Sequence, residues 1–350
     1  MKRKQNNLLG IFRFSIFLTV ILAGVTFWQL GWQGLWLFFV LLILEVTFSF
    51  DNAVVNSRTL ASMSLIWQRI FLTVGIFIAV FAVRFLLPIV IVIFASGLNF
   101  GEVVNMALNN PERYGHVLHD ASPMINAFGG IFLLMIGLSY FVDYNKQIHW
   151  VRGVEPWLAR AGKFENFRAC LILLVMVILY FTVEEKYKAM ILISSVLGTL
   201  LHIGLELFGS LFGSHSSKDI KLKTGWAAFA AFLYLEVLDA SFSFDGVIGA
   251  FAITSSVILI TSGLSAGAIW VRSLTIYLMR SGTLSKYRYL EHGAHWAIVA
   301  LGIMMLFKLF HVELPEWITG SLGLAFIILA IGSSVIEARH SKNTKNLQSS

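Results

Sequence analysis

The sequence predicts an all-α protein, a polytopic transmembrane helix bundle of about ten spans in two inverted five-helix repeats. Three observations support this fold class. The chain of 350 residues is 57% hydrophobic and only 13% charged, whereas about 25% of the residues in a soluble domain are charged. Apolar runs of about 17–25 residues, long enough to cross a bilayer, follow one another between short polar segments. One acidic motif also occurs twice, once in each half of the chain.

Each expected span is an apolar run bounded by charged or turn residues. The third run is long enough to tilt or to bend at Pro88, and the fifth is short and begins at Arg168. In chain order, the expected spans are residues 9-30, 34-56, 65-96, 123-143, 168-184, 189-213, 225-251, 255-279, 292-310 and 317-336.

The first apolar run follows the basic segment MKRKQNN and resembles a signal peptide. No A-x-A cleavage sequence follows it, and the next apolar run begins almost at once, so we expect a retained first helix. The single cysteine, Cys170, excludes an intrachain disulfide and a cysteine-based metal site.

Basic residues predict the orientation of the spans. The net charge of +7 does not indicate nucleic-acid binding, because the lysines and arginines lie in short loops between apolar runs. Nineteen of them fall in the alternate segments that include the N-terminus, and four fall on the opposite side. The positive-inside rule therefore predicts a multi-pass protein with both termini cytoplasmic.

The two halves of the chain share a motif with matched surroundings. EVTFSFDNAVVN at 45-56 aligns with DASFSFDGVIGA at 239-250, and a glycine nine residues before an arginine follows each, at Gly75 to Arg84 and Gly263 to Arg272. Because five spans are an odd number, the halves would cross the membrane in opposite directions, as in inverted-repeat transporters. We expect the first repeat at 1-186, with a cytoplasmic loop near 145-167, the second at 187-338 and a cytoplasmic tail at 339-350.

The acids of this motif would be costly in a bilayer, at about 2.5–3.5 kcal/mol each on insertion scales. In an unbroken helix Glu45 and Asp51 would point about 240° apart, so we expect the two motif helices to unwind near Ser49 and Ser243. The carboxylates can then converge on one divalent cation near the midplane, and an oxygen-rich shell suits Mn²⁺, Ca²⁺ or Mg²⁺. The expected metal ligands are Glu45, Asp51, Asp239 and Asp245, and further candidates for ligands or path are Ser49, Asn52, Glu236 and Ser243.

Packing is the alternative interpretation of these acids, with hydrogen bonds or ion pairs to Arg84 and Arg272 in place of a metal. Each arginine would either compensate the charge of an acid when the site is empty or extend its charged end to the membrane interface.

Other polar residues have weaker patterns. His202 with Glu206, and Glu291 with His295, lie four residues apart on one helix face. We interpret these pairs as helix-stabilising contacts, with a proton path as the alternative. The outer segment 97-122 contains Glu102, Glu112, His116, His119 and Asp120, and we expect a solvated loop with a short amphipathic helix there rather than a cation-gathering site.

The motifs EVTFSFDN and DASFSFDG and the stretches WQRIFLTVGIFIAVFAVR, INAFGGIFLLMIG, YLEVLDASFSFDGVIGAFAI and YLEHGAHWAI resemble TerC-like integral membrane proteins of the LysE superfamily. The resemblance covers roughly residues 8-338, and the chain is similar to a bacterial subfamily designated only as a domain of unknown function. This resemblance implies an inverted-repeat transporter fold, with metal-ion export, chiefly of manganese, for some relatives and tellurium resistance for others. Gly246 stands where the first copy has Asn52, so the halves do not offer equivalent ligands.

We therefore expect a divalent metal cation exporter of the manganese type, which works in the lipid bilayer of the bacterial cytoplasmic (inner) membrane by alternating access with proton coupling. We expect no permanently bound cofactor and no enzymatic activity. The alternatives are an exporter of amino acids or other small solutes, and a non-transporting membrane subunit of a metal or tellurium stress complex. An intramembrane aspartyl protease would also need two facing aspartates, but its G-x-G-D pattern is absent from the chain.

Overall fold

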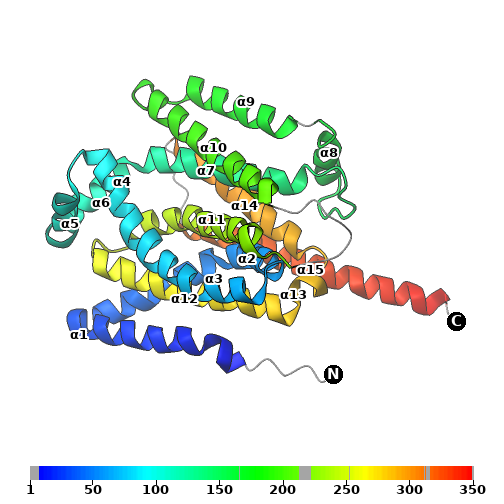
Figure 1. Cartoon of the computed structure of the whole chain (residues 1–350), viewed down its shortest axis with the longest axis horizontal. Coiled ribbons are helices and arrows are strands. Elements are labelled where there is room, and N and C mark those ends of the chain that lie inside the picture. Colours follow the sequence, from blue (N-terminus) through cyan, green and yellow to red (C-terminus); the bar gives the residue numbers. More distant parts are fainter. Residues whose placement is uncertain are drawn as a thin grey trace.

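The computed structural model describes residues 8–164, 166–212, 222–251, 253–310, 312 and 316–348, without some of the side chains in these ranges, that of Asp245 among them. The described chain folds almost entirely into helices that pack in one bundle (Figure 1). An isolated bridge between Met63 and Lys223 is its only β pairing. The all-α class that the sequence predicts is therefore confirmed.

The first helix, α1 (Leu8–Phe48), consists of two antiparallel arms joined at Gly31. Gly31 has φ 64° and ψ −157°, a backbone conformation that is essentially restricted to glycine, and the chain reverses there. Both arms pack on α12 (Val257–Ser281), and they run along it in opposite directions. The contacts are Ser15 with Ser273 and Thr19 with Trp270 in the first arm, and Leu41 with Gly263 and Glu45 with Gly267 in the second.

The second arm continues into α2 (Phe50–Ala61) after a turn at Ser49. The third expected span is then one uninterrupted helical run, in which a π-helix, η1 (Ile78–Leu86), joins α3 (Leu65–Phe77) to α4 (Leu87–Ser96). Pro88 lies in the first turn of α4 and has no N–H to donate, so the turn before it cannot keep regular α-helical bonding.

Most of the remaining helices follow the expected spans, and short helices lie between some of them. Two short helices take the place of the single amphipathic helix expected in segment 97-122, a 3₁₀ turn precedes the sixth span, and the last helix continues beyond residue 336. In chain order they are α5 (Phe100–Asn109), α6 (Pro111–Asp120), α7 (Ser122–Phe141), α8 (Val154–Ala161), α9 (Phe167–Thr182), η2 (Glu185–Tyr187), α10 (Lys188–Phe212), α11 (Gly225–Phe251), α13 (Thr283–Lys286), α14 (Leu290–Lys308) and α15 (Glu316–Gln348).

The length and apolarity of the helices make this a multi-pass membrane protein. Within the described ranges, eight helices are long and apolar enough to cross a bilayer. One of these is α1, which contains two arms, and α9 is a further apolar helix of 16 residues. The start of α1 and the end of α15 lie at the same end of the bundle, together with α8 and α13 (Figure 1). An even number of crossings, as the sequence predicts, accounts for that placement.

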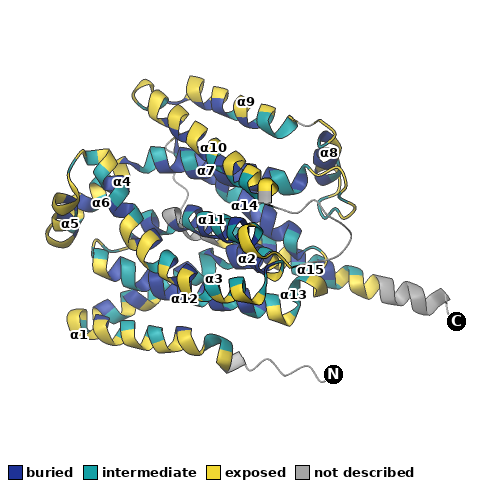
Figure 2. Cartoon of the chain, viewed as in Figure 1, coloured by how far each residue is buried: buried dark blue, intermediate teal, exposed yellow. Residues whose placement is uncertain are grey.

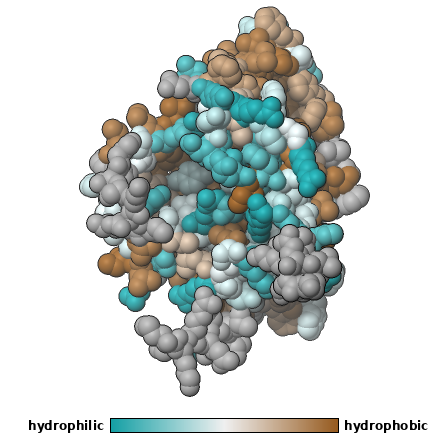
Figure 3. All heavy atoms as spheres, turned by 90° about the vertical axis from the view of Figure 1, so that its right-hand side faces the viewer, coloured by the Kyte–Doolittle hydropathy of each residue, from teal (hydrophilic) through white to brown (hydrophobic). Residues whose placement is uncertain are grey.

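Burial divides the bundle into a centre and a periphery. The ribbons of α7, α11 and α14 are mostly buried, whereas α9 and the first arm of α1 expose most of their residues (Figure 2). Many of the exposed side chains are large and apolar, for example Trp28, Trp32 and Phe94. At the end of the bundle that carries α8 and α13, the surface is hydrophilic in the middle and hydrophobic around it (Figure 3). Lipid contact explains an apolar periphery of this kind.

Candidate functional site

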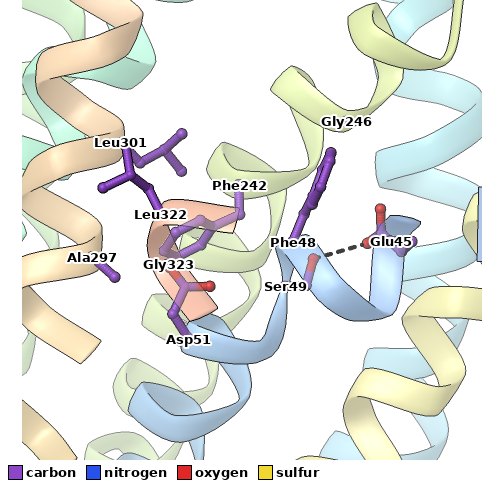
Figure 4. Close-up of a pocket in the computed structure, with 10 residues that line it drawn as sticks. All are labelled: Glu45, Phe48, Ser49, Asp51, Phe242, Gly246, Ala297, Leu301, Leu322 and Gly323. Carbon is purple, nitrogen blue, oxygen red and sulfur yellow. Dashed lines mark hydrogen bonds between the residues drawn. The ribbon is translucent and has the colours of Figure 1, made fainter. Parts of the chain in front are cut away.

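The site begins where α1 breaks at Ser49. The backbone of Ser49 has φ −99° and ψ 16°, which separates Glu45 in the last turn of α1 from Asp51 in the first turn of α2. The Ser49 hydroxyl donates a hydrogen bond to Glu45 Oε1 at 3.2 Å (Figure 4). The expected interruption near Ser49 is therefore present, and the two acids lie on either side of it.

The second expected interruption is wrong. The helix α11 runs from Gly225 to Phe251 without a break at Ser243. Asp239 explains why this helix does not need to unwind, because its carboxylate is bonded by the side chains of Asn52 and Arg272 from two neighbouring helices. Unwinding a helix would free backbone groups to bond a buried polar group, but the Asp239 carboxylate already has side-chain partners and does not need them.

Arg84, from the π-helix η1, forms an ion pair with Glu45. Both side chains are buried. The other terminal nitrogen, Arg84 Nη1, donates to the backbone oxygen of Ala79 at 2.9 Å. Ion pairing offsets the cost of the buried carboxylate, which otherwise would be several kcal/mol, roughly 3–5 when one partner of a buried pair is missing.

Arg272, from α12, binds a second group of acids. Its two terminal nitrogens bond both oxygens of Glu236, at 2.9 and 2.8 Å, and Nη2 also lies 3.3 Å from Asp239 Oδ2. The guanidinium further donates to the backbone oxygen of Phe71 at 3.1 Å and lies 4.3 Å from the centre of the Phe71 ring. Gly75 makes room for this group, because a Cβ there would lie 2.3 Å from Arg272 Nη1.

The two motif helices lie antiparallel and meet through matched positions. Asn52 Nδ2 donates to Asp239 Oδ1 at 2.8 Å. At the other end of the contact, a Cβ on Gly246 would lie 3.3 Å from Glu45 Oε2. In the alignment of the repeats, Glu45 corresponds to Asp239 and Asn52 to Gly246. Each motif thus presents its first acid to the same position of the other motif.

A cavity lies beside the break at Ser49 (Figure 4). Glu45 and Asp51 contribute its carboxylates, and they line it from different sides rather than meeting at one point. Asp51 accepts a hydrogen bond from the backbone N–H of Asn52 at 2.9 Å, and within the described chain it has no basic partner. The other walls are Phe48, Ser49, Phe242, Gly246, Ala297, Leu301, Leu322 and Gly323.

A second, more apolar cavity adjoins the first. Glu45, Phe48 and Gly246 line both cavities, and the second extends to Ile253, just beyond the end of α11. Glu45 therefore lies at the junction of two cavities, one of which leads towards Asp51 and the other towards an exposed residue.

The expected four-carboxylate metal site stays a prediction. Among the described side chains, no three Asp, Glu, His or Cys residues lie close enough together to hold a metal ion. The side chain of Asp245 lies outside the described part of the structure. Of the other expected ligands, Glu45 and Asp239 each contact an arginine, and Asp51 lies in the cavity. Ser243 is buried, and its hydroxyl has no hydrogen-bond partner in the described chain.

The two histidine–glutamate pairs lie apart from these acids. His202 Nε2 is 3.1 Å from the Ser139 hydroxyl, and Glu206 forms an ion pair with Arg168 on a half-exposed surface. Glu291 forms an ion pair with Arg58. His295 Nδ1 lies 2.8 Å from the backbone oxygen of Glu291, and its ring stacks on that of Tyr140. His202 Nε2 also lies 3.8 Å from Glu206 Oε2, so each pair makes a contact within its own helix, and the Ser139, Arg168 and Arg58 contacts reach other helices.

Sequence reasoning missed a buried polar network at the α8 end of the bundle. Glu155 of α8 lies 2.8 Å from His292 Nδ1 and accepts hydrogen bonds from Trp296 Nε1 and the Trp150 backbone at 2.8 and 2.7 Å. Burial raises the pKa of Glu155, but these hydrogen bonds outweigh burial and leave the pKa below its usual value. Nearby, burial lowers the pKa of Lys146 to about 7. A glutamate in a short, mixed-charge loop helix gave no signal that it would be buried.

Comparison with known proteins identifies a family. Residues 50–341 match the family described as "Protein of unknown function (DUF475)". No curated protein and no solved structure matches the chain.

Proposed function

This protein belongs to the DUF475 family, whose match covers most of the chain, and we propose that it is a transporter that moves a divalent metal cation past Glu45 and Asp51. One observation carries the proposal. Two buried carboxylates, on either side of a helix break, line one cavity between two antiparallel motif helices. Ionisable groups inside a membrane bundle are costly and are typical of ion pathways.

The chemistry of the lining favours a hard cation. The polar atoms offered to the cavity are carboxylate, hydroxyl and backbone oxygens, while sulfur and imidazole are absent from its described lining. Oxygen ligands suit Mn²⁺, Mg²⁺ and Ca²⁺. The resemblance to TerC-like proteins makes manganese the first cation to test, and export the first direction.

The ion pairs explain how the empty protein tolerates its acids. Arg84 compensates Glu45, and Arg272 compensates Glu236 and Asp239. A cation that reaches Glu45 competes with Arg84 for the same carboxylate. When the cation leaves, the arginine or protons replace it, because an uncompensated acid there is expensive. Where protons replace the cation, at acids such as Asp51 that have no basic partner in the described chain, transport would be coupled to protons.

Inverted repeats give this site a way to open on alternate sides. The antiparallel motif helices, their matched contacts at Asn52–Asp239 and Gly246–Glu45, and the matched arginines all support two five-helix units of opposite orientation. Rocking of one unit against the other would expose Glu45 first to one cavity and then to the other. The charge pattern supports cytoplasmic termini, and the resemblance to a bacterial subfamily supports the bacterial inner membrane.

Transport by purified protein in proteoliposomes tests the proposal. We expect the wild type to move Mn²⁺ down a gradient, and Asp51→Asn to lower the rate by about tenfold or more because it removes a charge from the cavity while keeping its shape. Glu185→Gln is the matched control, since it neutralises an acid that lies exposed in η2, just before α10. A wild type that moves no Mn²⁺, Mg²⁺ or Ca²⁺, or an Asp51→Asn protein as fast as the control, contradicts the proposal.

A further inference from the structure

The two arginine–acid pairs occupy corresponding positions of the repeat. Arg84 contacts Glu45, and Arg272 contacts Asp239, so each arginine binds the first acid of the motif in its own half. If the two repeats worked in the same way, both pairs would have the same role. The surroundings of the two pairs differ, however, in four respects.

The Arg272 pair makes several contacts at once. Its guanidinium binds two acids, Glu236 and Asp239, and also a backbone oxygen and the face of an aromatic ring, both from Phe71. Asn52 supplies a further hydrogen bond to Asp239. The arginine lies in the regular α-helix α12. To move the guanidinium, all of these contacts must break together.

The Arg84 pair has fewer restraints. Its guanidinium binds one acid, Glu45, and one backbone oxygen within its own helical segment, that of Ala79. The only other hydrogen bond to the Glu45 carboxylate in the described chain is local, from the Ser49 hydroxyl four residues along. No amide corresponds to Asn52, because Gly246 stands at the matched position, and cavities lie on that side of Glu45. Arg84 also lies in the π-helix η1, and π turns are frequent at functional sites. Converting one π turn to an α turn shifts the helix beyond it by about one residue, roughly 100° of rotation.

We propose that the two pairs have different roles: Glu45–Arg84 opens and closes as the cation binds and leaves, whereas Arg272 with Glu236 and Asp239 stays closed as a fixed anchor. Gly246 keeps Glu45 free to exchange partners, and a change in η1 withdraws Arg84. This inference rests on the proposed function and assigns the exchanging group within the same site.

Net transport and cation exchange, measured on the same proteoliposomes, separate the two roles. In net transport, the empty protein must change conformation so that its site faces the loading side again. During this step, Arg84 must lie beside Glu45 to compensate its charge. Exchange of Mn²⁺ for labelled Mn²⁺ keeps the site loaded. We expect Arg84→Gln to lower the ratio of net transport to exchange by about tenfold or more. Arg272→Gln should lower both rates in proportion, because it weakens the anchor at every step.

A pair of variants at Gly246 tests the same inference without removing a charge. Gly246→Asn supplies the amide that Asn52 supplies in the other half, and we expect it to hold Glu45 and to slow both net transport and exchange by about tenfold or more. Gly246→Ala is the control, since its methyl group would lie 3.3 Å from Glu45 Oε2 and carries no hydrogen-bond donor. Thermal unfolding of each purified variant shows whether slow transport reflects a loss of fold.

The outcomes are distinct. If the wild type moves no cation, the proposed function fails and this inference fails with it. If the wild type transports but Arg84→Gln and Arg272→Gln change the ratio equally, or Arg272→Gln alone changes it, only the inference is overturned. A folded Gly246→Asn protein that transports as fast as Gly246→Ala overturns it as well.

Discussion

Replacing Glu155 with glutamine should loosen the contact between α8 and the start of α14. Glu155 is buried and accepts hydrogen bonds at both oxygens. An ionised carboxylate only accepts hydrogen bonds, so the Nδ1 atom of His292 carries the proton that faces it. In Glu155→Gln one carboxylate oxygen becomes an NH₂ group, which can only donate hydrogen bonds. At least one of the three donors around the side chain, the Trp150 N–H, His292 Nδ1–H and Trp296 Nε1–H, then faces another donor.

The size of this effect follows from the contacts. One unsatisfied buried donor costs about 1–3 kcal/mol, and the loss of charge from the two remaining hydrogen bonds costs about 1 kcal/mol each. The sum is about 3–5 kcal/mol against local opening. Since about 1.4 kcal/mol is a factor of ten, the backbone amide of Trp150 should exchange with deuterium about 100-fold faster or more in the variant.

Hydrogen–deuterium exchange followed by mass spectrometry of the peptide that contains Trp150 makes this measurement. Asp143→Asn is the matched control, because Asp143 lies exposed in the same loop and its carboxylate accepts a hydrogen bond from the backbone N–H of Asn145. It should change the exchange rate by about twofold at most. Equal exchange in Glu155→Gln and the control would refute the reasoning.

The same contact predicts a dependence on pH. Hydrogen bonds hold the pKa of Glu155 below its usual value of 4.5, so the folded state favours the ionised carboxylate. The stabilisation is therefore present above about pH 4.5 and is lost as the pH falls through the lower pKa of the folded protein. The difference between wild type and Glu155→Gln should shrink in acid, and a constant difference would contradict this assignment.

Three further predictions concern single positions. Gly75→Val places a side chain against Arg272 and should lower the thermal unfolding temperature and the yield of folded protein, with a cost of about 1–3 kcal/mol or more; an unchanged transition contradicts it. Gly31→Ala strains the reversal of α1 by about 1–3 kcal/mol, whereas Gly24→Ala, with no atom within 4 Å of its new methyl, should unfold like the wild type. Burial of Lys146 lowers its pKa to about 7 from the usual 10.5, so stability should rise with pH between these values, and Lys146→Met should remove that rise.

The helical framework could be predicted from the sequence because it depends on local features. These are the lengths of the apolar runs and the charged or turn residues that bound them. Gly31 falls between the first two expected spans, and the break at Ser49 follows from two acids in one apolar run. The unbroken α11 was not predictable in the same way, since Asp239 is satisfied by Asn52 and Arg272 from distant parts of the chain. Which partners reach a buried acid depends on packing, and packing leaves no periodic signal.

The arginines illustrate the same limit. The sequence offered Arg84 and Arg272 two roles, charge compensation or contact with the interface, and only three-dimensional packing places both against acids. The sequence also made Glu236 a candidate for a ligand or path residue. In the structure Arg272 binds both of its oxygens, and Glu236 does not line the cavity around Glu45 and Asp51.

Direct binding of a divalent cation to the purified protein tests the central claim. Isothermal titration with Mn²⁺ should give one ion per chain for the wild type, and binding to Asp51→Asn should be weaker by about tenfold or more, since a charged ligand is lost. Glu185→Gln should bind like the wild type. We expect that order of affinities. A wild type that binds no Mn²⁺, Mg²⁺ or Ca²⁺, or an Asp51→Asn protein that binds as tightly as the wild type, would contradict the proposed cation site.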